Sequence, residues 1–141
     1  MKRILFINGP NLNMLGVREP DIYGTQTLNE IIEKAKAGAA EMGFEIEPYQ
    51  SNHEGALIDF IQDNYQNSDG IIINPGALTH YGYSLRDCLA ATGLTIIEVH
   101  ISDIQKREEW RKKSVVSDIC AEVISGLGSE GYFKALEFFR D

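Results

Sequence analysis

Short apolar runs alternate with amphipathic stretches along the chain. Four of these runs predict strands of a sheet that is covered on both faces. They are residues 3–8 (RILFIN), 44–50 (FEIEPYQ), 70–74 (GIIIN) and 94–100 (LTIIEVH). Pro48 places the second strand at or near a sheet edge, because proline cannot donate a ladder hydrogen bond.

Apolar residues at helical spacing predict helices between these strands. The stretch 28–43 opens with a capping-box pattern of Thr27 and Glu30 and stops at Gly43. Ser51 and Glu54 form a second capping-box pattern ahead of ALIDFIQDNY. Further helical patterns cover YSLRDCLAAT and two segments, near 115–125 and 132–140.

Four strands separated by helices predict an α/β protein with a parallel sheet. For a chain of 141 residues, the natural architecture is a three-layer, flavodoxin-like fold with helices on both faces of the sheet. This length is typical of one domain, and no stretch has the composition of a linker. We therefore expect a single domain over residues 1–141.

The charge of the chain narrows its partners. A net charge of −8 argues against nucleic acid as a partner. Five of the thirteen basic residues nevertheless fall within KREEWRKK, residues 106–113. This local cluster favours a small anionic ligand, but a solvated helix in which Glu108 and Glu109 balance the basic side chains fits the pattern equally well.

The lengths of the apolar runs and the setting of the two cysteines indicate where the protein is located and whether its thiols react. No apolar run approaches the roughly 18 to 20 residues that cross a membrane, and the apolar run after MKR is too short for a signal peptide. We expect a cytoplasmic protein without a membrane partner. Cys88 and Cys120 lie in apolar helical patterns, far from metal-like spacing, and are predicted to be buried, inert thiols.

The candidate site lies beyond the carboxyl ends of the strands, where open parallel sheets bind their ligands. The residues there read NGPN, QSN, NPGALTH and EVHIS, although turn formation alone would explain many of these asparagines and glycines. No dinucleotide or Walker motif is present, and His53, His80 and His100 lack the pairing of a zinc motif. The sequence therefore predicts no cofactor and no metal.

His100 and Glu98 are the first candidates for chemistry. Side chains two residues apart on a strand point to the same side, so the carboxylate of Glu98 lies beside the imidazole of His100. A carboxylate in that position fixes the imidazole tautomer and favours its charged form, which suits a general acid. A purely structural ion pair would have the same pattern, and both interpretations stay open at this point.

The stretch LGVREPDIYG, residues 15–24, is long for a connection between a strand and a helix. It carries Arg18 and Tyr23. A phenol with its ordinary pKa of about 10 is a poor base at neutral pH, but a guanidinium about 4 Å away offsets about 4 kcal/mol of that handicap. Arg18 could therefore activate Tyr23 as a base. The two residues could equally be a packed tyrosine and a surface arginine.

Five blocks in consecutive order resemble a known family. INGPNLNMLGVREPDIYG, QSNHEG, NPGALTHYGYSLRD, EVHIS and GLGSEGY are together similar to type II 3-dehydroquinate dehydratases, over nearly the whole chain. The resemblance implies a flavodoxin-like lyase without a cofactor, which removes water from the small anion 3-dehydroquinate to give 3-dehydroshikimate. In this family the stretch 15–24 is a lid that closes over the site.

The resemblance also assigns roles to the catalytic residues. It implies that Tyr23 is the base, that Arg18 is the lid arginine, and that Asn11 helps to stabilise an enolate through a water molecule. His100 matches the acid of the family, and Glu98 matches its partner.

Substrate contacts and assembly are implied in the same way. Asn74, His80 and Arg111 match residues that hold substrate hydroxyls, and the backbone amides of Ile101 and Ser102 match the carboxylate site. A further match, Asp87, implies an aspartate that reaches the site of a neighbouring subunit. The resemblance thus implies a homo-oligomer, a dodecamer built as a tetramer of trimers.

The sequence departs from the family pattern at several positions. Tyr81 and Gly82 follow TH where many relatives have small hydroxyl residues, Asp103 stands where asparagine is common, and Lys112 and Lys113 replace a frequent histidine pair. We expect these differences to affect affinity and assembly rather than chemistry.

Two functional hypotheses follow. The first is the dehydratase, which would serve the shikimate pathway of aromatic amino acid biosynthesis or, alternatively, quinate catabolism. The second is a flavodoxin-like protein that binds a small anion without catalysis, since a fold alone does not determine an activity.

Overall fold

A computed structural model describes residues 1–17, 21 and 25–140. Its centre is a parallel sheet in the order β2-β1-β3-β4-β5, the strand order of flavodoxin-like folds. The strands are β1 (Lys2–Asn8), β2 (Phe44–Gln50), β3 (Gly70–Asn74), β4 (Thr95–His100) and β5 (Glu122–Ser125). The predicted parallel α/β fold is confirmed, and β2 with its Pro48 lies at an edge, as expected.

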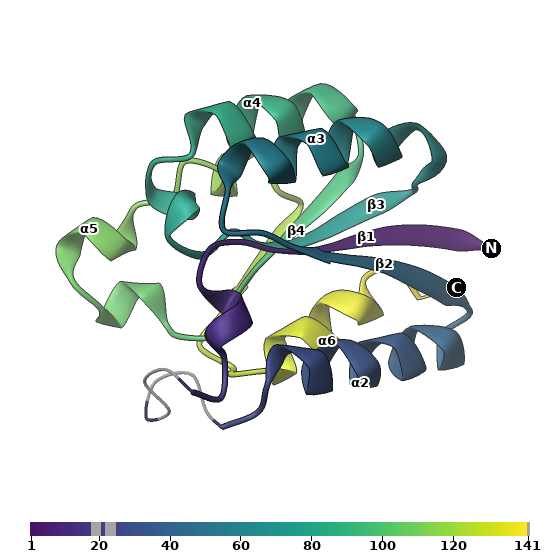
Figure 1. Cartoon of the computed structure of the whole chain (residues 1–141), viewed down its shortest axis with the longest axis horizontal. Helices are drawn as coiled ribbons and strands as arrows, with labels where there is room; N and C mark the ends of the chain where they lie inside the picture. Colours follow the sequence, from purple (N-terminus) through teal and green to yellow (C-terminus); the bar gives the residue numbers. More distant parts are fainter. Residues whose placement is uncertain (18–20, 22–24, 141) are drawn as a thin grey trace.

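Helices cover both faces of the sheet and form the outer two of three layers. Figure 1 shows α3 (Glu54–Asn64) and α4 (Tyr83–Thr92) on one face, and α2 (Leu28–Glu41) and α6 (Glu130–Glu137) on the other. The short helix α5 (Glu109–Lys112) lies near the carboxyl ends of the strands. The described residues also contain short 3-10 turns: η1 (Leu12–Met14), η2 (Tyr65–Asn67), η3 (Gly76–His80), η4 (Ile104–Lys106) and η5 (Ser117–Ile119).

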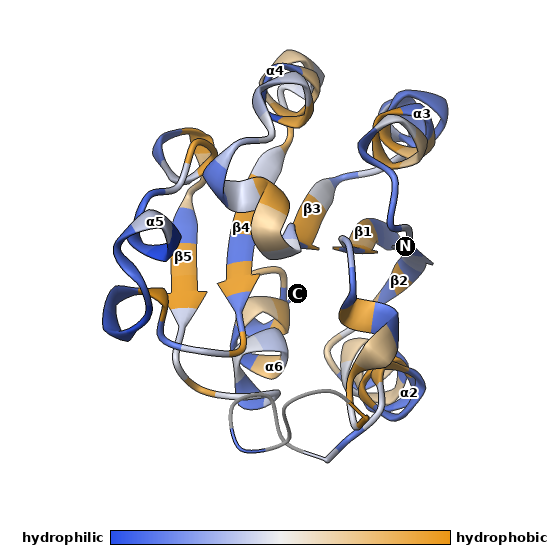
Figure 2. Ribbon diagram, turned by 60° about the vertical axis from the view of Figure 1, so that its left-hand side comes forward, coloured by the Kyte–Doolittle hydropathy of each residue, from blue (hydrophilic) through white to orange (hydrophobic). Residues whose placement is uncertain are grey.

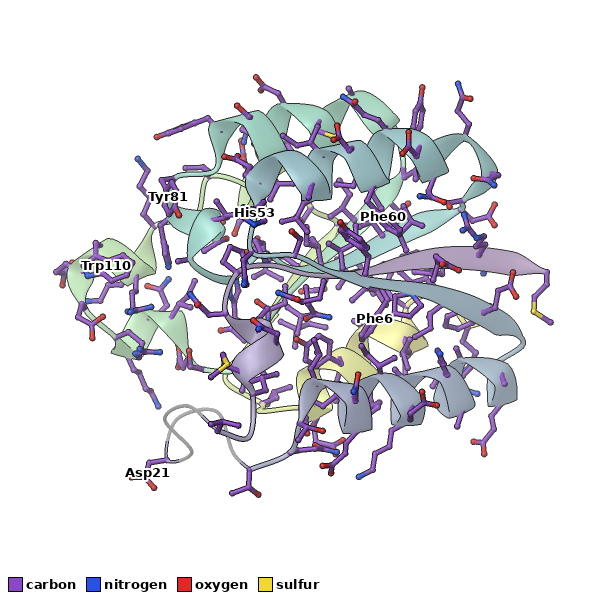
Figure 3. All side chains as sticks on the ribbon, in the orientation of Figure 1. Phe6, Asp21, His53, Phe60, Tyr81 and Trp110 are labelled. Carbon is purple, nitrogen blue, oxygen red and sulfur yellow. The ribbon has the colours of Figure 1, made fainter. Side chains whose placement is uncertain are left out.

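Strand side chains alternate between two apolar layers. Leu5 and Ile73 pack beneath α3 and α4, whereas Phe6 and Val99 pack with α2 and α6. Figure 3 shows Phe6 on the α2 and α6 side of the sheet and Phe60 on the α3 side, and Figure 2 shows hydrophobic residues on the helix faces that turn toward the strands. Each large buried side chain stabilises the fold by roughly 1.5–3 kcal/mol relative to exposure.

The segment near 115–125 corrects a prediction, because it is not a helix. It contains the short turn η5 and then β5, which pairs in parallel with β4 from Ile97↔Glu122 to His100↔Ser125. Its apolar residues do follow a helical period, but the open edge of β4 offers backbone hydrogen bonds that this segment takes up instead. The sheet therefore has five strands rather than the predicted four.

One of the two predicted helix starts is confirmed. The side chain of Thr27 accepts a hydrogen bond from Glu30 N, which caps α2. The pattern of Ser51 and Glu54 is wrong as a capping box, since the N-cap of α3 is His53 and makes no side-chain cap bond. The carboxylate of Glu54 instead accepts from Leu85 N at 3.0 Å, in the first turn of α4, and so joins two neighbouring helices.

Both cysteines are free thiols. Cys88 is buried on α4, as predicted, and burial raises the pKa of its thiol. Cys120 is only half-buried and precedes β5, so its predicted helical setting is wrong. Burial is the main cause that raises the pKa of Cys120 to about 12. Among the described residues, no helix is long and apolar enough to cross a membrane.

Candidate active site

A cavity of about 170 Å³ opens at the carboxyl ends of the strands, the end near α5 in Figure 1. This is where the parallel sheet predicts a ligand site. Predicted site residues from four separate parts of the chain line it, namely Asn11, Asn74, His80, His100, Ile101, Ser102 and Arg111. The fold therefore brings together most of the residues that the sequence singled out.

The loops after β1 and β3 are packed back to back at the floor of this cavity. Gly9 N donates to Asn74 O at 2.8 Å, and a Cβ at Gly9 would lie only 2.3 Å from Pro75 O. Gly76 has φ +62°, and a Cβ there would lie 2.9 Å from Pro10 O. The motifs NGPN and NPG thus need their glycines because the two loops touch through their backbones.

Asn11 is held by the loop after β2. It has φ 70°, a left-handed conformation that asparagine tolerates better than most residues. Its backbone N–H donates to Asn52 Oδ1 at 2.9 Å, and Gln50 Nε2 donates to the same oxygen at 3.2 Å. These bonds tie the QSN motif to the wall of the cavity.

Glu98 is fully buried and surrounded by hydrogen-bond donors. Thr79 Oγ1 donates to its Oε2 at 2.7 Å, and Ser117 Oγ donates to its Oε1 at 2.7 Å. Ser114 Oγ lies at 3.3 and 3.4 Å from the two carboxylate oxygens. We call Glu98 and the hydroxyls of Thr79, Ser114 and Ser117 the carboxylate cluster.

His100 completes the pair that the sequence predicted. Its Nε2 bonds directly to Glu98 Oε2, and its side chain is almost wholly buried. An ionised carboxylate only accepts hydrogen bonds, so Nε2 is the donor. Burial acts to raise the pKa of Glu98, but the hydrogen bonds from His100, Thr79 and Ser117 outweigh it and hold this pKa below its ordinary value.

His80 presents one nitrogen to the cavity. Its Nδ1 lies 2.5 Å from Lys113 O, a carbonyl that can only accept, so the proton is on Nδ1. Burial is the main cause that lowers the pKa of His80, and the positive side chain of Arg111 acts in the same direction. The neutral ring therefore has a free acceptor, Nε2, for a ligand hydroxyl.

The basic stretch 106–113 combines both of the arrangements that its sequence allowed. Lys112 pairs with Glu109 on the surface, as in a solvated helix. Arg111 also pairs with Glu108, but it lines the cavity and lies over the Trp110 ring at 4.1 Å. The cavity thus has a positive wall, and none of the described residues that line it is acidic.

Arg107 is a cavity residue that the sequence reasoning did not single out. It lines the cavity, and its Nη1 donates to Ser102 Oγ at 3.2 Å. The signal was present in the charged stretch, but four other basic residues there have the same pattern. Arg107 is distinguished from its neighbours on the surface only by the path of the chain after β4, which the sequence does not show.

Some of the positions that depart from the family pattern lie near His80. Lys113 Nζ donates to Tyr83 OH at 3.1 Å, next to the carbonyl that holds the His80 ring. Gly82 has no room for a side chain, because a Cβ there would lie 2.7 Å from Leu78 O. Tyr81 is exposed beside α5 (Figure 3), and Asp103 accepts from Gln105 N at the start of η4.

Of the predicted site residues, Glu98 does not line the cavity but is bonded to His100, which does. Three others are not placed in this cavity. Asp87 is exposed on α4 and does not line it. Arg18 and Tyr23, with most of the predicted lid, lie outside the described residues. Of the glycines that bound this lid, Gly16 is described, and its φ of +87° is a turn conformation.

Chemically, the described site offers an imidazole with a buried carboxylate partner, a neutral histidine and two arginines. Within residues 1–17, 21 and 25–140, no group of three or more His, Cys, Asp or Glu side chains is arranged to hold a metal ion. Such a site can bind an anion with hydroxyl groups and transfer a proton to it.

Comparison with known proteins gives consistent matches. The family model "Dehydroquinase class II" matches residues 2–140. The 3-dehydroquinate dehydratase of Halothermothrix orenii is 53% identical over 137 residues, which are 97% of this chain and 93% of that protein. The catabolic 3-dehydroquinase of Aspergillus clavatus is 52% identical over 96% of this chain and 91% of its own. The crystal structure of type II dehydroquinase from Butyrivibrio crossotus superposes with a TM-score of 0.95 at 48% identity, over 97% of this chain and 96% of that one.

Proposed function

The chain belongs to the class II dehydroquinase family and is a 3-dehydroquinate dehydratase, a lyase, and we propose that it removes water from 3-dehydroquinate by acid–base catalysis in the cavity described above. The observation that carries the proposal is the bond between His100 and the buried, ionised Glu98. An imidazole held in this way can donate a proton and then be protonated again.

The reaction begins with proton abstraction. Tyr23, as phenolate, takes a proton from the carbon next to the substrate ketone, and the electron pair moves onto the ketone oxygen to form an enolate. Arg18 keeps the phenol ionised through its positive charge. Asn11, which lines the cavity, stabilises the enolate oxygen through a water molecule. The roles of Tyr23 and Arg18 rest on the family resemblance alone.

The second step is loss of the hydroxyl group. The enolate collapses, the carbon–oxygen bond breaks, and the departing hydroxyl takes a proton from His100 and leaves as water. Because Nε2 of His100 is bonded to Glu98, we assign the donated proton to Nδ1. The negative charge of Glu98 stabilises the imidazolium before the transfer. Solvent then returns a proton to His100 and removes one from Tyr23.

The remaining residues hold the substrate. Asn74, the neutral His80 and Arg111 bind its hydroxyl groups, and the backbone amides of Ile101 and Ser102 bind its carboxylate. The positive wall of the cavity supports this assignment, since Arg107 and Arg111 attract an anion. We add Arg107 to the carboxylate site because it bonds to the side chain of Ser102.

Assembly and pathway belong to the same proposal. We propose one domain that forms a dodecamer, a tetramer of trimers, in which the exposed Asp87 reaches the cavity of a neighbouring subunit. We also propose a cytoplasmic role in the shikimate pathway. One relative is named a catabolic enzyme, so quinate catabolism is the alternative. Deletion of the gene would separate them, since only the biosynthetic role predicts a requirement for aromatic amino acids.

The test is turnover by the purified protein without added metal or cofactor. We expect near-ultraviolet absorbance from the conjugated product, and a mass of twelve subunits in solution. A folded, assembled protein that binds 3-dehydroquinate in a calorimeter without converting it would overturn catalysis and favour a small-anion binding protein.

Tyr23→Phe tests the base. This variant lacks only the phenolic oxygen, so we expect turnover to be abolished while the substrate still binds, as measured by calorimetry. Tyr49→Phe is the matched control, because Tyr49 packs against Phe60 away from the cavity. Wild-type turnover in Tyr23→Phe would refute the proposed base.

A further inference from the structure

Tyr132 ends the motif GLGSEGY, to which the proposed reaction assigns no role. It lies on α6, and its side chain is fully buried against Phe6, with ring centroids 5.2 Å apart. We propose that Tyr132 is a positioning residue, which orients the amide of Asn74 toward the substrate from beneath the cavity. The inference rests on the proposed role of Asn74 as a substrate-binding residue.

Tyr132 joins the ends of two neighbouring strands. Its hydroxyl donates to Asn8 Oδ1, the last residue of β1, at 2.5 Å, and accepts from Asn74 Nδ2, the last residue of β3, at 3.0 Å. Asn8 and Asn74 are paired in the sheet, and both are buried. We call these three residues the amide cluster.

The direction of these bonds follows from their chemistry. Asn8 Oδ1 can only accept, so the hydroxyl proton of Tyr132 points to it, and a lone pair of the hydroxyl faces Asn74. Burial raises the pKa of Tyr132 well above its ordinary value, so the hydroxyl keeps its proton at any physiological pH. The hydroxyl therefore offers Asn74 an acceptor and no donor.

The opposite end of the Asn74 amide is also held. Asn74 Oδ1 accepts from Gly76 N at 3.1 Å, which places Nδ2 toward Tyr132. An amide nitrogen has two hydrogens, and the Tyr132 hydroxyl accepts a hydrogen bond from one of them. Asn74 lines the cavity, so the second hydrogen remains for a substrate oxygen. Without the hydroxyl, only the bond to Gly76 would resist rotation of the amide.

The two polar atoms of the Asn8 side chain differ in their hydrogen bonding. Its Nδ2 is buried and has no hydrogen-bond partner among the described residues, a costly arrangement for an amide. Its Oδ1, in contrast, receives the short bond from Tyr132. We infer that Asn8 acts through its Oδ1. This oxygen accepts the hydroxyl proton of Tyr132, so the proton does not point toward Asn74.

Tyr132→Phe removes the hydroxyl and keeps the ring packing. We expect KM for 3-dehydroquinate to rise about tenfold, the cost of one hydrogen bond in a buried site, while kcat stays within about threefold. Phe44→Leu is the control, since it removes packing in the same apolar layer at the far end of the sheet. It should lower the melting temperature and leave KM unchanged.

The decisive test is a double-mutant cycle with Asn74→Ala. If Tyr132 acts through Asn74, Tyr132→Phe raises KM in the native background and adds nothing once Asn74 is alanine. Equal effects of Tyr132→Phe in both backgrounds, or an unchanged KM in Tyr132→Phe, would overturn the inference and leave the role of Asn74 intact. An unchanged KM in Asn74→Ala alone would instead remove that role, and the inference with it.

A second variant covers the case in which Tyr132→Phe does not fold. Asn8→Ala leaves the tyrosine in place but removes the acceptor that directs its proton. The hydroxyl can then turn its proton toward Asn74, so we expect KM to rise about threefold. The same cycle with Asn74→Ala applies, and an additive result again contradicts the inference.

Discussion

The carboxylate cluster and the amide cluster lie under the same cavity, on opposite faces of the sheet. Glu98 points to the α4 side, where hydroxyl groups surround an ionised carboxylate. Asn8 and Asn74 point to the α6 side, where one hydroxyl joins two neutral amides. Glu98 and the three residues of the amide cluster are buried. The carboxylate cluster contacts one side chain that lines the cavity, His100, and the amide cluster includes another, Asn74.

The difference between the clusters is one of charge. A buried carboxylate is stable only when several donors compensate for the lost water, and Glu98 has such donors on both oxygens. Its charge can then act on a proton at His100. The amide cluster has no charge to offer and can only fix a direction. We therefore expect damage to the carboxylate cluster to lower kcat, and damage to the amide cluster to raise KM.

The largest effect should come from His100→Ala. This variant removes the proposed acid but leaves the arginines that attract the substrate, so we expect kcat to fall by about 10²- to 10⁴-fold and KM to change by less than about threefold. Steady-state kinetics measure both values. His53→Ala is the control, since His53 lies at the start of α3 and does not line the cavity. A wild-type kcat in His100→Ala would refute the acid.

Glu98→Gln should have the next largest effect. The side chain keeps its size but loses its charge. Its amide nitrogen is a donor, and it faces one of the hydroxyl groups that donate to the native carboxylate. We expect kcat to fall about 10²-fold, and the free energy of unfolding to fall by about 1–3 kcal/mol because a buried donor loses its acceptor. Glu122→Gln, on the exposed neighbouring strand, should change neither quantity. If kcat were unchanged in Glu98→Gln, the pair would be purely structural.

Ser117→Ala should have a smaller effect that depends on pH. The pKa of Glu98 in the folded protein lies below its ordinary value of 4.5, so its charge stabilises the fold above that pH and ceases to do so as the pH falls. Loss of the Ser117 bond raises the folded pKa. We expect about 1–2 kcal/mol lower stability at pH 7, and a smaller further loss of stability below pH 4.5 than in the native protein, because less of the stabilising interaction with the charge remains to be lost.

Thermal unfolding between pH 3 and pH 7 measures this change. Cys120→Ala is the matched control, because its sulfur lies 3.9 Å from the same carboxylate oxygen and is a weak donor. Its stability should follow the native pH dependence. Parallel curves for Ser117→Ala and the native protein would show that the serine does not stabilise the charge of Glu98.

Much of the fold could be predicted from the sequence, because buried parallel strands have a plain pattern. β3 and the bounds of α4 match the prediction. The failure at β5 has a physical cause, since Val115, Val116, Ile119 and Cys120 follow a helical period. The edge of β4 that recruits this segment as a strand exists only in the folded protein. The position of Glu54 is similar, because its partner on α4 is 31 residues away.

The candidate site divides in the same way. The pairing of Glu98 with His100 follows from strand alternation, so the sequence could predict it. The donors around Glu98 could not be predicted, since Ser117 is 19 residues away and has no local pattern. Tyr132 was visible as the end of a motif, but its bond to Asn8 spans 124 residues. Local rules place side chains within one element, and only the packed sheet brings these partners together.

The most direct measurement compares kcat and KM of Glu98→Gln and Tyr132→Phe with those of the native enzyme, in one buffer with 3-dehydroquinate as substrate. Two clusters with separate tasks predict opposite results, in which Glu98→Gln lowers kcat about 10²-fold at nearly constant KM and Tyr132→Phe raises KM about tenfold at nearly constant kcat. If both variants changed the same parameter by the same factor, the proposed division between proton transfer and substrate orientation would be contradicted.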